Sequence, residues 1–271
     1  MQIIGEKING TLEQVKAAIR ERNATFIQDL ARRQAEAGAA LIDVNAGVRP
    51  DQEPETLSWL VKIVQEVVDV PLSLDSANPQ ALAAALQEVK QPPMINSISG
   101  EQSRLEGILP FVSKHSCSVI ALAMDENGIP KGVQERLAVI RRLIDRTRSA
   151  GVPDEKVYID PLVMAISTNT ESGLIALETI RAVHTEFPKV HFCAGLSNVS
   201  FGLPARNLVN RVFLTLALAA GLDSAIMDPF DRALREELLA AELVLGRDPY
   251  CRNYTRAYRQ GLIGSKRGTE N

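Results

Sequence analysis

Polar side chains stand at the ends of most of the short apolar segments that can form β-strands in this chain. Seven segment ends carry them, and the residues are Glu6, Asp43 with Asn45, Asp75, Asn96, Asp160, Ser197 with Asn198, and Asp228. A single Asp, Asn or Ser at such a place often caps the next helix or turn. Seven ends of this kind are hard to explain by capping, and they predict a binding site built from carboxylates and amides.

The residue types in this set restrict the chemistry of the ligand. The set contains no arginine or histidine, so it is poorly suited to clamping a phosphate or holding a metal through imidazole. A carboxylate can accept two parallel hydrogen bonds from a 2-amino-4-oxo ring, and an amide can both donate and accept. A pterin ring fits this pattern, and a divalent cation bound by carboxylates is the competing interpretation.

Short β-rich segments alternate with longer segments of helical period along almost the whole chain. Strands are expected at Gln2–Gly5, Ala40–Val44, Pro71–Leu74, Met94–Asn96, Val119–Ala123, Val157–Ile159, Val190–Ala194 and Ser224–Met227. Helices are expected at Thr25–Ala37, Pro54–Val68, Pro79–Val89, Arg104–Lys114, Val133–Ala150, Ser172–Phe187, Asn207–Ala220 and Arg232–Leu245. The helical periodicity is clear where apolar residues recur three or four apart, as in Val133, Leu137, Ile140 and Ile144.

Eight strands that are each followed by a helix predict an α/β fold, a (β/α)8 TIM barrel. A doubly wound open sheet is the alternative, but its glycine-rich phosphate turn is replaced here by GEKING after the first strand. We expect one domain over residues 1–271, with a short packing helix in DPYCRNYTRAYRQG after Arg247 and a polar C-terminal tail from about 260 to 271. Barrel active sites lie where the strands end, so the polar residues should meet at one mouth.

Composition excludes several classes of protein. The net charge of −3 with mixed signs offers no basic surface for nucleic acid. No apolar run is long enough to span a membrane, and the opening MQIIGEKING lacks the features of a signal peptide, so we expect a cytoplasmic protein. Three scattered cysteines and three histidines show no disulfide framework and no metal-ligand spacing, so no metal site is expected.

Motifs along the chain identify a family resemblance. They are IIGEKING, IDVNAG, LSLDSAN, MINSISGE, MDENGIPK, YIDPL, GLSNVSFGLPARNLVNRVFL and AAGLDSAIMDP. Together they resemble the pterin-binding methyltransferases that act on methyltetrahydrofolate and corrinoid proteins. The folate domain of cobalamin-dependent methionine synthase is similar, and dihydropteroate synthase is a more distant relative. The resemblance runs from residue 2 to about residue 255, and it implies a dihydropteroate-synthase-like barrel.

The resemblance also implies roles for particular residues. Asp75, Asn96 and Asp160 match the residues that hold the pterin ring, and Asn198 matches the one that reaches the methyl-bearing N5. The positions expected near the ligand are Glu6, Gly195, Ser197 and Arg206. Lys7 departs from the arginine of the family's GERING pattern, and ISTNTESG resembles the methionine-synthase domain and stand-alone methyltransferases more than the corrinoid/iron–sulfur enzymes. The corrinoid partner and the direction of transfer therefore stay open.

The implied reaction moves a methyl group between N5 of (methyl)tetrahydrofolate and cobalamin. The amine leaves only if a proton or strong hydrogen bond reaches N5 as the C–N bond breaks. We expect Asn198 to donate that hydrogen bond, while Asp75 and Asp160 support a water network that relays the proton. None of the three histidines lies in a DxHxxG motif, so cobalamin is expected on a separate corrinoid protein that docks over the barrel mouth.

Three other functions are alternatives to methyl transfer. A dihydropteroate synthase must bind pyrophosphate, yet NAGVRP after the second strand offers only Arg49. A Schiff-base aldolase needs a lysine at the mouth, and strict strand alternation predicts that Lys7 points away from Glu6. A non-catalytic folate-binding subunit would bind the same ligand without transferring methyl. Finally, the apolar stretch LVNRVFLTLALAAGL, together with the pairing of relatives, predicts a homodimer.

Overall fold

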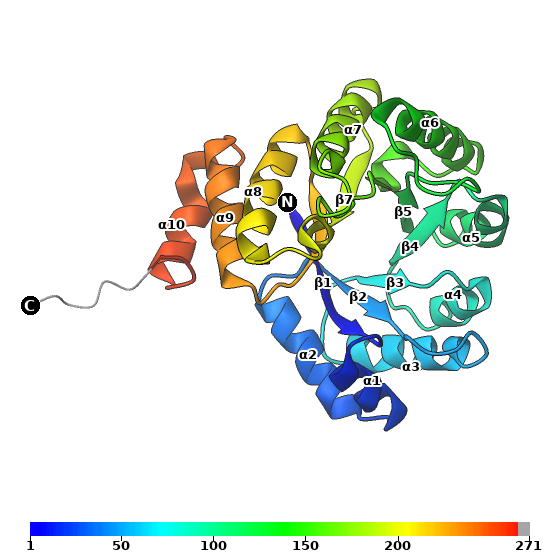
Figure 1. Ribbon diagram of the computed structural model, residues 1–271. Helices are drawn as coiled ribbons and strands as arrows, with labels where there is room; N and C mark the ends of the chain where they lie inside the picture. The colour runs from blue at the N-terminus through cyan, green and yellow to red at the C-terminus, as the bar shows by residue number, and fades with distance from the viewer. Residues whose placement is uncertain (265–271) are drawn as a thin grey trace, which may run out of the picture.

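Eight parallel strands close into a barrel in sequence order, and β1 pairs with β8 to complete the ring (Figure 1). The computed structural model describes residues 1–264 of the 271-residue chain. The strands are β1 (Gln2–Asn9), β2 (Leu41–Asn45), β3 (Leu72–Asp75), β4 (Met94–Ser99), β5 (Ser118–Leu122), β6 (Val157–Asp160), β7 (His191–Gly195) and β8 (Ser224–Met227). The prediction of a TIM barrel is confirmed, and every strand lies where the sequence placed it, with shifted ends.

Helices follow the strands and surround the barrel (Figure 1). They are α1 (Glu13–Arg20), α2 (Ala24–Glu36), α3 (Glu53–Gln65), α4 (Pro79–Leu86), α5 (Gln102–Lys114), α6 (Val133–Ser149), α7 (Ser172–Glu186), α8 (Arg206–Ala220), α9 (Arg232–Val244) and α10 (Arg252–Arg259). Short 3-10 turns are η1 (Asp154–Lys156), η2 (Leu196–Ser200) and η3 (Pro249–Cys251). In Figure 1, α10 is the outermost helix, beside α9.

One helix was not predicted from the sequence. α1 has eight residues, of which Val15, Ala18 and Ile19 are buried. A helix this short shows barely two turns of periodicity, and it is stable only because tertiary contacts cover its apolar face. It lies between β1 and α2, so it extends the loop that follows the first strand.

The alternation of side chains along each strand produces an apolar floor and a polar mouth. One cluster of buried residues comes from six strands and fills the barrel interior: Ile4, Leu41, Met94, Ile120, Tyr158 and Cys193. Their strand neighbours, such as Ile42 and Phe192, belong to the larger core between strands and helices. Because the side-chain period of a strand is two, the next inward position after each floor residue lies at the C-terminal mouth. Four of these positions are Glu6, Asp43, Asn96 and Asp160.

The residues that cap the helix N-termini are not the polar residues of the barrel mouth. The side chains of Asn23, Asn78 and Asp231 accept hydrogen bonds from the backbone amides of Phe26, Gln80 and Leu234 over 3.0–3.1 Å. Dedicated caps of this kind satisfy the free amides of a helix start. The polar residues at the ends of β2, β3 and β4 are therefore left for another role.

The sequence also predicts that the chain has no membrane span and that it ends in a short helix and a polar tail. Within residues 1–264, no helix is long and apolar enough to cross a membrane. The segment after Arg247 forms η3 and α10, in agreement with the expected short helix. The expected polar tail, about 260–271, lies outside the described residues from 265 onward.

Candidate active site

A cavity of about 290 Å³ opens at the C-terminal mouth of the barrel. It brings together three of the predicted site residues, which come from separate strands. Its lining consists of Glu6, Lys7, Asn9, Leu12, Asp43, Asp75, Asn96 and Ile226. The predicted convergence of strand-end carboxylates and amides is therefore present for β1 to β4, and we call this space the mouth cavity.

A bulge in β1 changes the expected lining of the mouth cavity. The first strand does not end at Glu6 but runs to Asn9, and its pairing with β2 shifts register between Gly5 and Ile8. Two residues, Glu6 and Lys7, therefore lie opposite the single residue Asp43. The prediction that Lys7 points away from Glu6 was wrong, because strict alternation fails at a bulge, and both side chains line the cavity.

Buried Gln34 stabilises this bulge. Its Oε1 accepts a hydrogen bond from the backbone N–H of Lys7 over 2.9 Å, which replaces a ladder bond lost at the register shift. Gly5 makes room for it, because a Cβ at that position would lie 2.5 Å from the same oxygen. The Lys7 ammonium pairs with Asp228 over 2.5 Å, so the amine is held as an ion-pair partner at the mouth.

Two hydrogen-bonded groups form the acidic side of the mouth cavity. Asp43 Oδ1 accepts from Ser73 Oγ over 2.7 Å and from Asn96 Nδ2 over 3.2 Å. Asp75 Oδ2 accepts from Asn45 Nδ2 over 2.9 Å. Each carboxylate keeps free lone pairs, because an ionised carboxyl can accept about four hydrogen bonds. These oxygens can therefore accept from N–H donors of a ligand ring without giving up their protein contacts.

Burial makes these carboxyl groups weak acids. Removal from water, together with the nearby Asp75 charge, raises the pKa of Asp43 to about 7. Burial also raises the pKa of Asp75 and that of Glu6. Desolvation disfavours a charged carboxylate, and neighbouring negative charges add to the effect. Perturbed acids in a cleft mark a functional site.

Asp43 belongs to the polar strand ends of the sequence, but the family resemblance assigned it no role at the ligand. Its side chain is only 4% exposed, and it lies at the base of the mouth cavity. The strand pattern could have identified Asp43. It lies two residues after Leu41, on the face of β2 that points into the barrel, at the same level as the predicted residues Glu6 and Asn96. It also lies in the family motif IDVNAG.

Asp160 is held by the loop that follows β6, and it does not line the mouth cavity. Its Oδ1 accepts from the backbone N–H of Leu162 over 2.7 Å, so capping explains part of its presence. Burial raises the pKa of Asp160 to about 6. The guanidinium of Arg136, which is 2% exposed, donates to the carbonyl oxygens of Pro161 and Leu162 and fixes the same loop.

Asn198 lies on the opposite side of the mouth in η2, with an exposed side chain. Gly195 permits its position, because a Cβ there would lie 2.9 Å from Asn198 Nδ2. Arg206 fixes the turn from the start of α8: its Nη2 donates to the Ser197 carbonyl over 2.7 Å and its Nε to Ser200 Oγ over 3.0 Å. Of the remaining predicted residues, Gly195, Ser197 and Arg206 thus form a group around Asn198, outside the cavity lining.

The competing interpretation of a divalent cation finds no support in this arrangement. Among residues 1–264, no group of three or more His, Cys, Asp or Glu side chains is placed to hold a metal ion. Asp43 and Asp75 are instead paired with a hydroxyl and with amides, which are hydrogen-bond donors. Metal-free ligand binding stays a prediction.

An eight-stranded parallel barrel with weakly acidic carboxyl groups at its C-terminal mouth defines an α/β-barrel enzyme. The chain belongs to the pterin-binding enzyme family, whose model matches residues 5–228. The family resemblance seen in the sequence motifs is thereby confirmed.

Individual relatives agree with this assignment. The chain is 41% identical over 266 residues to a methylcorrinoid:tetrahydrofolate methyltransferase of Eubacterium limosum, which covers 97% of this chain and 98% of the relative. It is 32% identical over 257 residues to methionine synthase of Mycobacterium leprae, covering 88% of this chain but only 21% of that protein.

Solved structures of dihydropteroate synthases share the fold. The enzyme from Stenotrophomonas maltophilia superposes with a TM-score of 0.69 at 19% identity, covering 90% of this chain and 92% of that one. The enzyme from Yersinia pestis gives 0.67 at 18% identity, covering 91% and 93%. The expectation of a dihydropteroate-synthase-like barrel is confirmed at the level of the fold.

Proposed function

We propose that this protein is a methyltransferase that moves a methyl group between N5 of a tetrahydrofolate and cobalamin bound to a separate corrinoid protein. The observation that carries the proposal is the meeting of Glu6, Asp43, Asp75 and Asn96 in one cavity of a pterin-binding barrel. The near full-length relative named as a methylcorrinoid:tetrahydrofolate methyltransferase supports the reaction class.

In this proposal the pterin ring lies in the mouth cavity, with its N–H donors toward the acidic side. Asp75 accepts hydrogen bonds from N–H groups of the ring, and Asn96 can both accept from the ring and donate to it. Asp160 extends the polar surface from β6. Asn198 faces them from η2, where its exposed amide has no hydrogen-bond partner within residues 1–264 and is free to donate to N5. Glu6, Gly195, Ser197 and Arg206 shape the two sides of the mouth.

Proton supply is the second requirement of the reaction. A group whose pKa is close to neutral can hold and release a proton at cellular pH. Burial raises the pKa of Asp43 to about 7, and its hydrogen bond to Asn96 connects it to the ring-binding residues. We propose that Asp43 acts as the proton reservoir of the site, from which water relays a proton toward N5, a role that amides cannot fill.

Cobalamin supplies the nucleophilic or methyl-bearing cobalt, and this chain supplies the folate pocket. We further propose that residues 1–271 form one pterin-binding domain, that the protein is cytoplasmic, and that it forms a homodimer. The corrinoid protein would dock over the mouth, where Asn198 and Leu12 are exposed.

A methyl-transfer assay with both reactant pairs tests the proposal. Purified protein is mixed with methyltetrahydrofolate and cob(I)alamin, and separately with tetrahydrofolate and methylcobalamin, in the presence of a chelator. We expect transfer in both directions, because both share one transition state, and the faster pair indicates the preferred direction. Tetrahydrofolate binding without transfer in either direction would identify a non-catalytic folate-binding subunit, and loss of binding on chelation would favour a metal site.

A further inference from the structure

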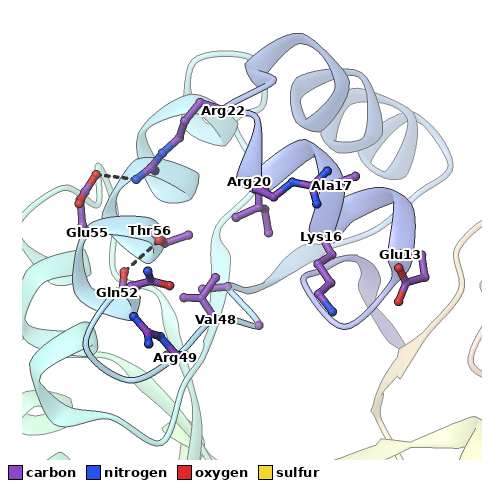
Figure 2. A pocket seen from close by; sticks show the side chains of 13 residues that line it. Glu13, Lys16, Ala17, Arg20, Arg22, Val48, Arg49, Gln52, Glu55 and Thr56 are labelled. Carbon is purple, nitrogen blue, oxygen red and sulfur yellow. Dashed lines mark hydrogen bonds and ion pairs between the residues drawn. The ribbon is translucent and has the colours of Figure 1, made fainter.

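A second cavity, of about 680 Å³, opens at the rim of the barrel between α1 and the segment that joins β2 to α3 (Figure 2). We call it the rim groove. Its charged lining residues are Glu13, Lys16, Arg20, Arg22, Arg49 and Glu55. Four cations and two carboxylates line it, and two further carboxylates, Glu21 and Asp51, pair with Arg20 and Arg49 from outside the lining.

The arginines of the rim groove are held in ion pairs whose side chains are exposed, so an anionic ligand can reach them. The pairs are Arg20 with Glu21, Arg22 with Glu55 and Arg49 with Asp51. Lys16 has no ion-pair partner within residues 1–264, and Figure 2 shows it on the α1 side of the groove, with Arg49 on the facing segment. Arg49 pairs with Asp51 over 3.1 Å, but both side chains are about two-thirds exposed or more. An exposed pair of this kind is weak, so a ligand carboxylate can replace Asp51 at little cost.

The rim groove and the mouth cavity share their walls. Asn9 and Leu12 line the mouth cavity, and the next residue, Glu13, lines the rim groove. On the other wall, the Asn45 amide contacts Asp75, and the residues that follow it line the rim groove. The Gly10 N–H donates to the Asn45 carbonyl over 2.9 Å and joins the two walls. Leu12, which is 45% exposed, lies at the junction.

We propose that the rim groove binds the oligo-γ-glutamate tail of the folate substrate, an inference that rests on the proposed function. A tetrahydrofolate carries a benzoyl ring after the pterin and then one or more glutamates, each with a free carboxylate. The exposed Leu12 gives the benzoyl ring an apolar contact as it leaves the polar cavity. Lys16 and Arg49 bind the first carboxylates, and Arg20 extends the site for longer tails, since guanidinium groups bind carboxylates through two hydrogen bonds.

Calorimetry with three ligands tests this proposal. The ligands are 6-methyltetrahydropterin, which has no tail, tetrahydrofolate monoglutamate and tetrahydrofolate triglutamate. We expect the wild type to bind the triglutamate roughly fivefold to tenfold more tightly than the monoglutamate, with a gain that shrinks as salt rises. The double variant Lys16→Gln/Arg49→Gln should bind both folates with nearly equal affinity, and its affinity for the tail-free pterin should match the wild type.

A matched control exists at the other end of the barrel. Lys114 and Arg146 line a groove between α5 and α6 and are exposed, so Lys114→Gln/Arg146→Gln removes the same charge without touching the rim groove. This control should keep the wild-type preference for the triglutamate. Equal binding of the two folates by the wild type, or an undiminished preference in the Lys16/Arg49 variant, would overturn the proposal. Failure of the wild type to bind even the tail-free pterin would instead contradict the proposed function itself.

Discussion

At the scale of single residues, the site divides into groups that bind the ring and one amide that faces the reacting atom. Asp43, Asp75 and Asn96 form the cavity wall, whereas Asn198 lies across the mouth in an exposed turn. A contact of Asp75 or Asn96 with the ring is made equally in the resting complex and in the transition state. A contact to N5 strengthens as charge develops there, and only such a contact accelerates the reaction.

Asn198→Ala should therefore reduce the methyl-transfer rate at saturating methyltetrahydrofolate by roughly 10²–10³-fold, as expected for loss of one preorganised donor. Single-turnover transfer to free cob(I)alamin measures this rate directly. A saturated rate equal to the wild type would show that Asn198 serves binding alone.

Asp75→Ala should weaken folate binding more than it lowers the methyl-transfer rate at saturating folate. It leaves ring donors of the ligand unpaired in a half-buried site, which weakens folate binding by about 1–3 kcal/mol. Asp160→Ala should do the same if the β6 loop reaches the ring. Calorimetric titration with tetrahydrofolate measures the affinity of both variants, and normal affinity in either one would show that this aspartate does not contact the ring.

Asp43 should make folding stability depend on pH in a particular direction. Its pKa is raised from 3.8 to about 7, so between about pH 4 and pH 7 the folded protein binds a proton that the unfolded chain does not. Its contribution to stability therefore falls as pH rises through this window. Asp43→Asn keeps an acceptor for Ser73 but cannot ionise, so the variant should gain stability relative to the wild type between pH 5 and pH 8. Urea unfolding at both pH values measures this, and an unchanged difference would rule out the raised pKa.

At the scale of elements, one arginine fixes each of the loops after β6 and β7. The loop after β6 is held from the preceding helix, α6, and the loop after β7 from the following helix, α8. Arg136 of α6 is buried and donates to the carbonyls of Pro130, Pro161 and Leu162. Arg206 of α8 binds the Ser197 carbonyl. Loops that carry functional residues need such support, because their own backbones make few regular hydrogen bonds.

Arg136→Met should lower the free energy of unfolding by about 1–3 kcal/mol, because it leaves buried carbonyls without a donor. It should also weaken folate binding if Asp160 contacts the ring. Denaturant unfolding measures the first effect, with Arg146→Met as the control, since Arg146 is an exposed residue of the same helix. Equal stability of the two variants would show that the hydrogen bonds of Arg136 to the loop carbonyls do not stabilise the fold.

At the scale of the whole molecule, a nearly all-carbon groove of about 520 Å³ lies between α7 and α8. Its exposed residues include Leu174, Leu208 and Val212, which are 53%, 57% and 60% exposed. The apolar stretch that predicted a homodimer thus keeps part of its apolar surface outside the core. Contiguous apolar surface of this kind is typical of protein interfaces.

We expect light scattering to give about twice the monomer mass of 29.6 kDa. Val212→Asp should shift the protein to the monomer, because it places an unpaired charge in the apolar contact. Lys114→Asp, in the groove between α5 and α6, should leave the mass unchanged. A wild-type protein of monomer mass at micromolar concentration would exclude the homodimer.

The sequence by itself determined the barrel and placed Glu6, Asp75 and Asn96 at strand ends, where the structure brings them into one cavity. The eightfold alternation of β-rich and helical segments requires neither long-range contacts nor unusual turns to be recognised. Strand-end position placed Asp75, Asn96 and Asp160 among the polar residues expected at the mouth, and the family resemblance predicted their role. The family motifs then indicated the pterin. These features are local, because periodicity and chain order are properties of neighbouring residues.

Only the tertiary structure decided the features that depend on contacts between distant segments. The β1 bulge brings Lys7 beside Glu6 through a hydrogen bond to Gln34, which is 27 residues away in the chain. The α1 helix exists because its short apolar face is covered, and the rim groove exists because α1 faces the segment after β2. The pKa of Asp43 follows from burial next to Asp75 on another strand. Register shifts, desolvation and side-chain contacts across the barrel arise only when the strands have closed, so no local pattern encodes them.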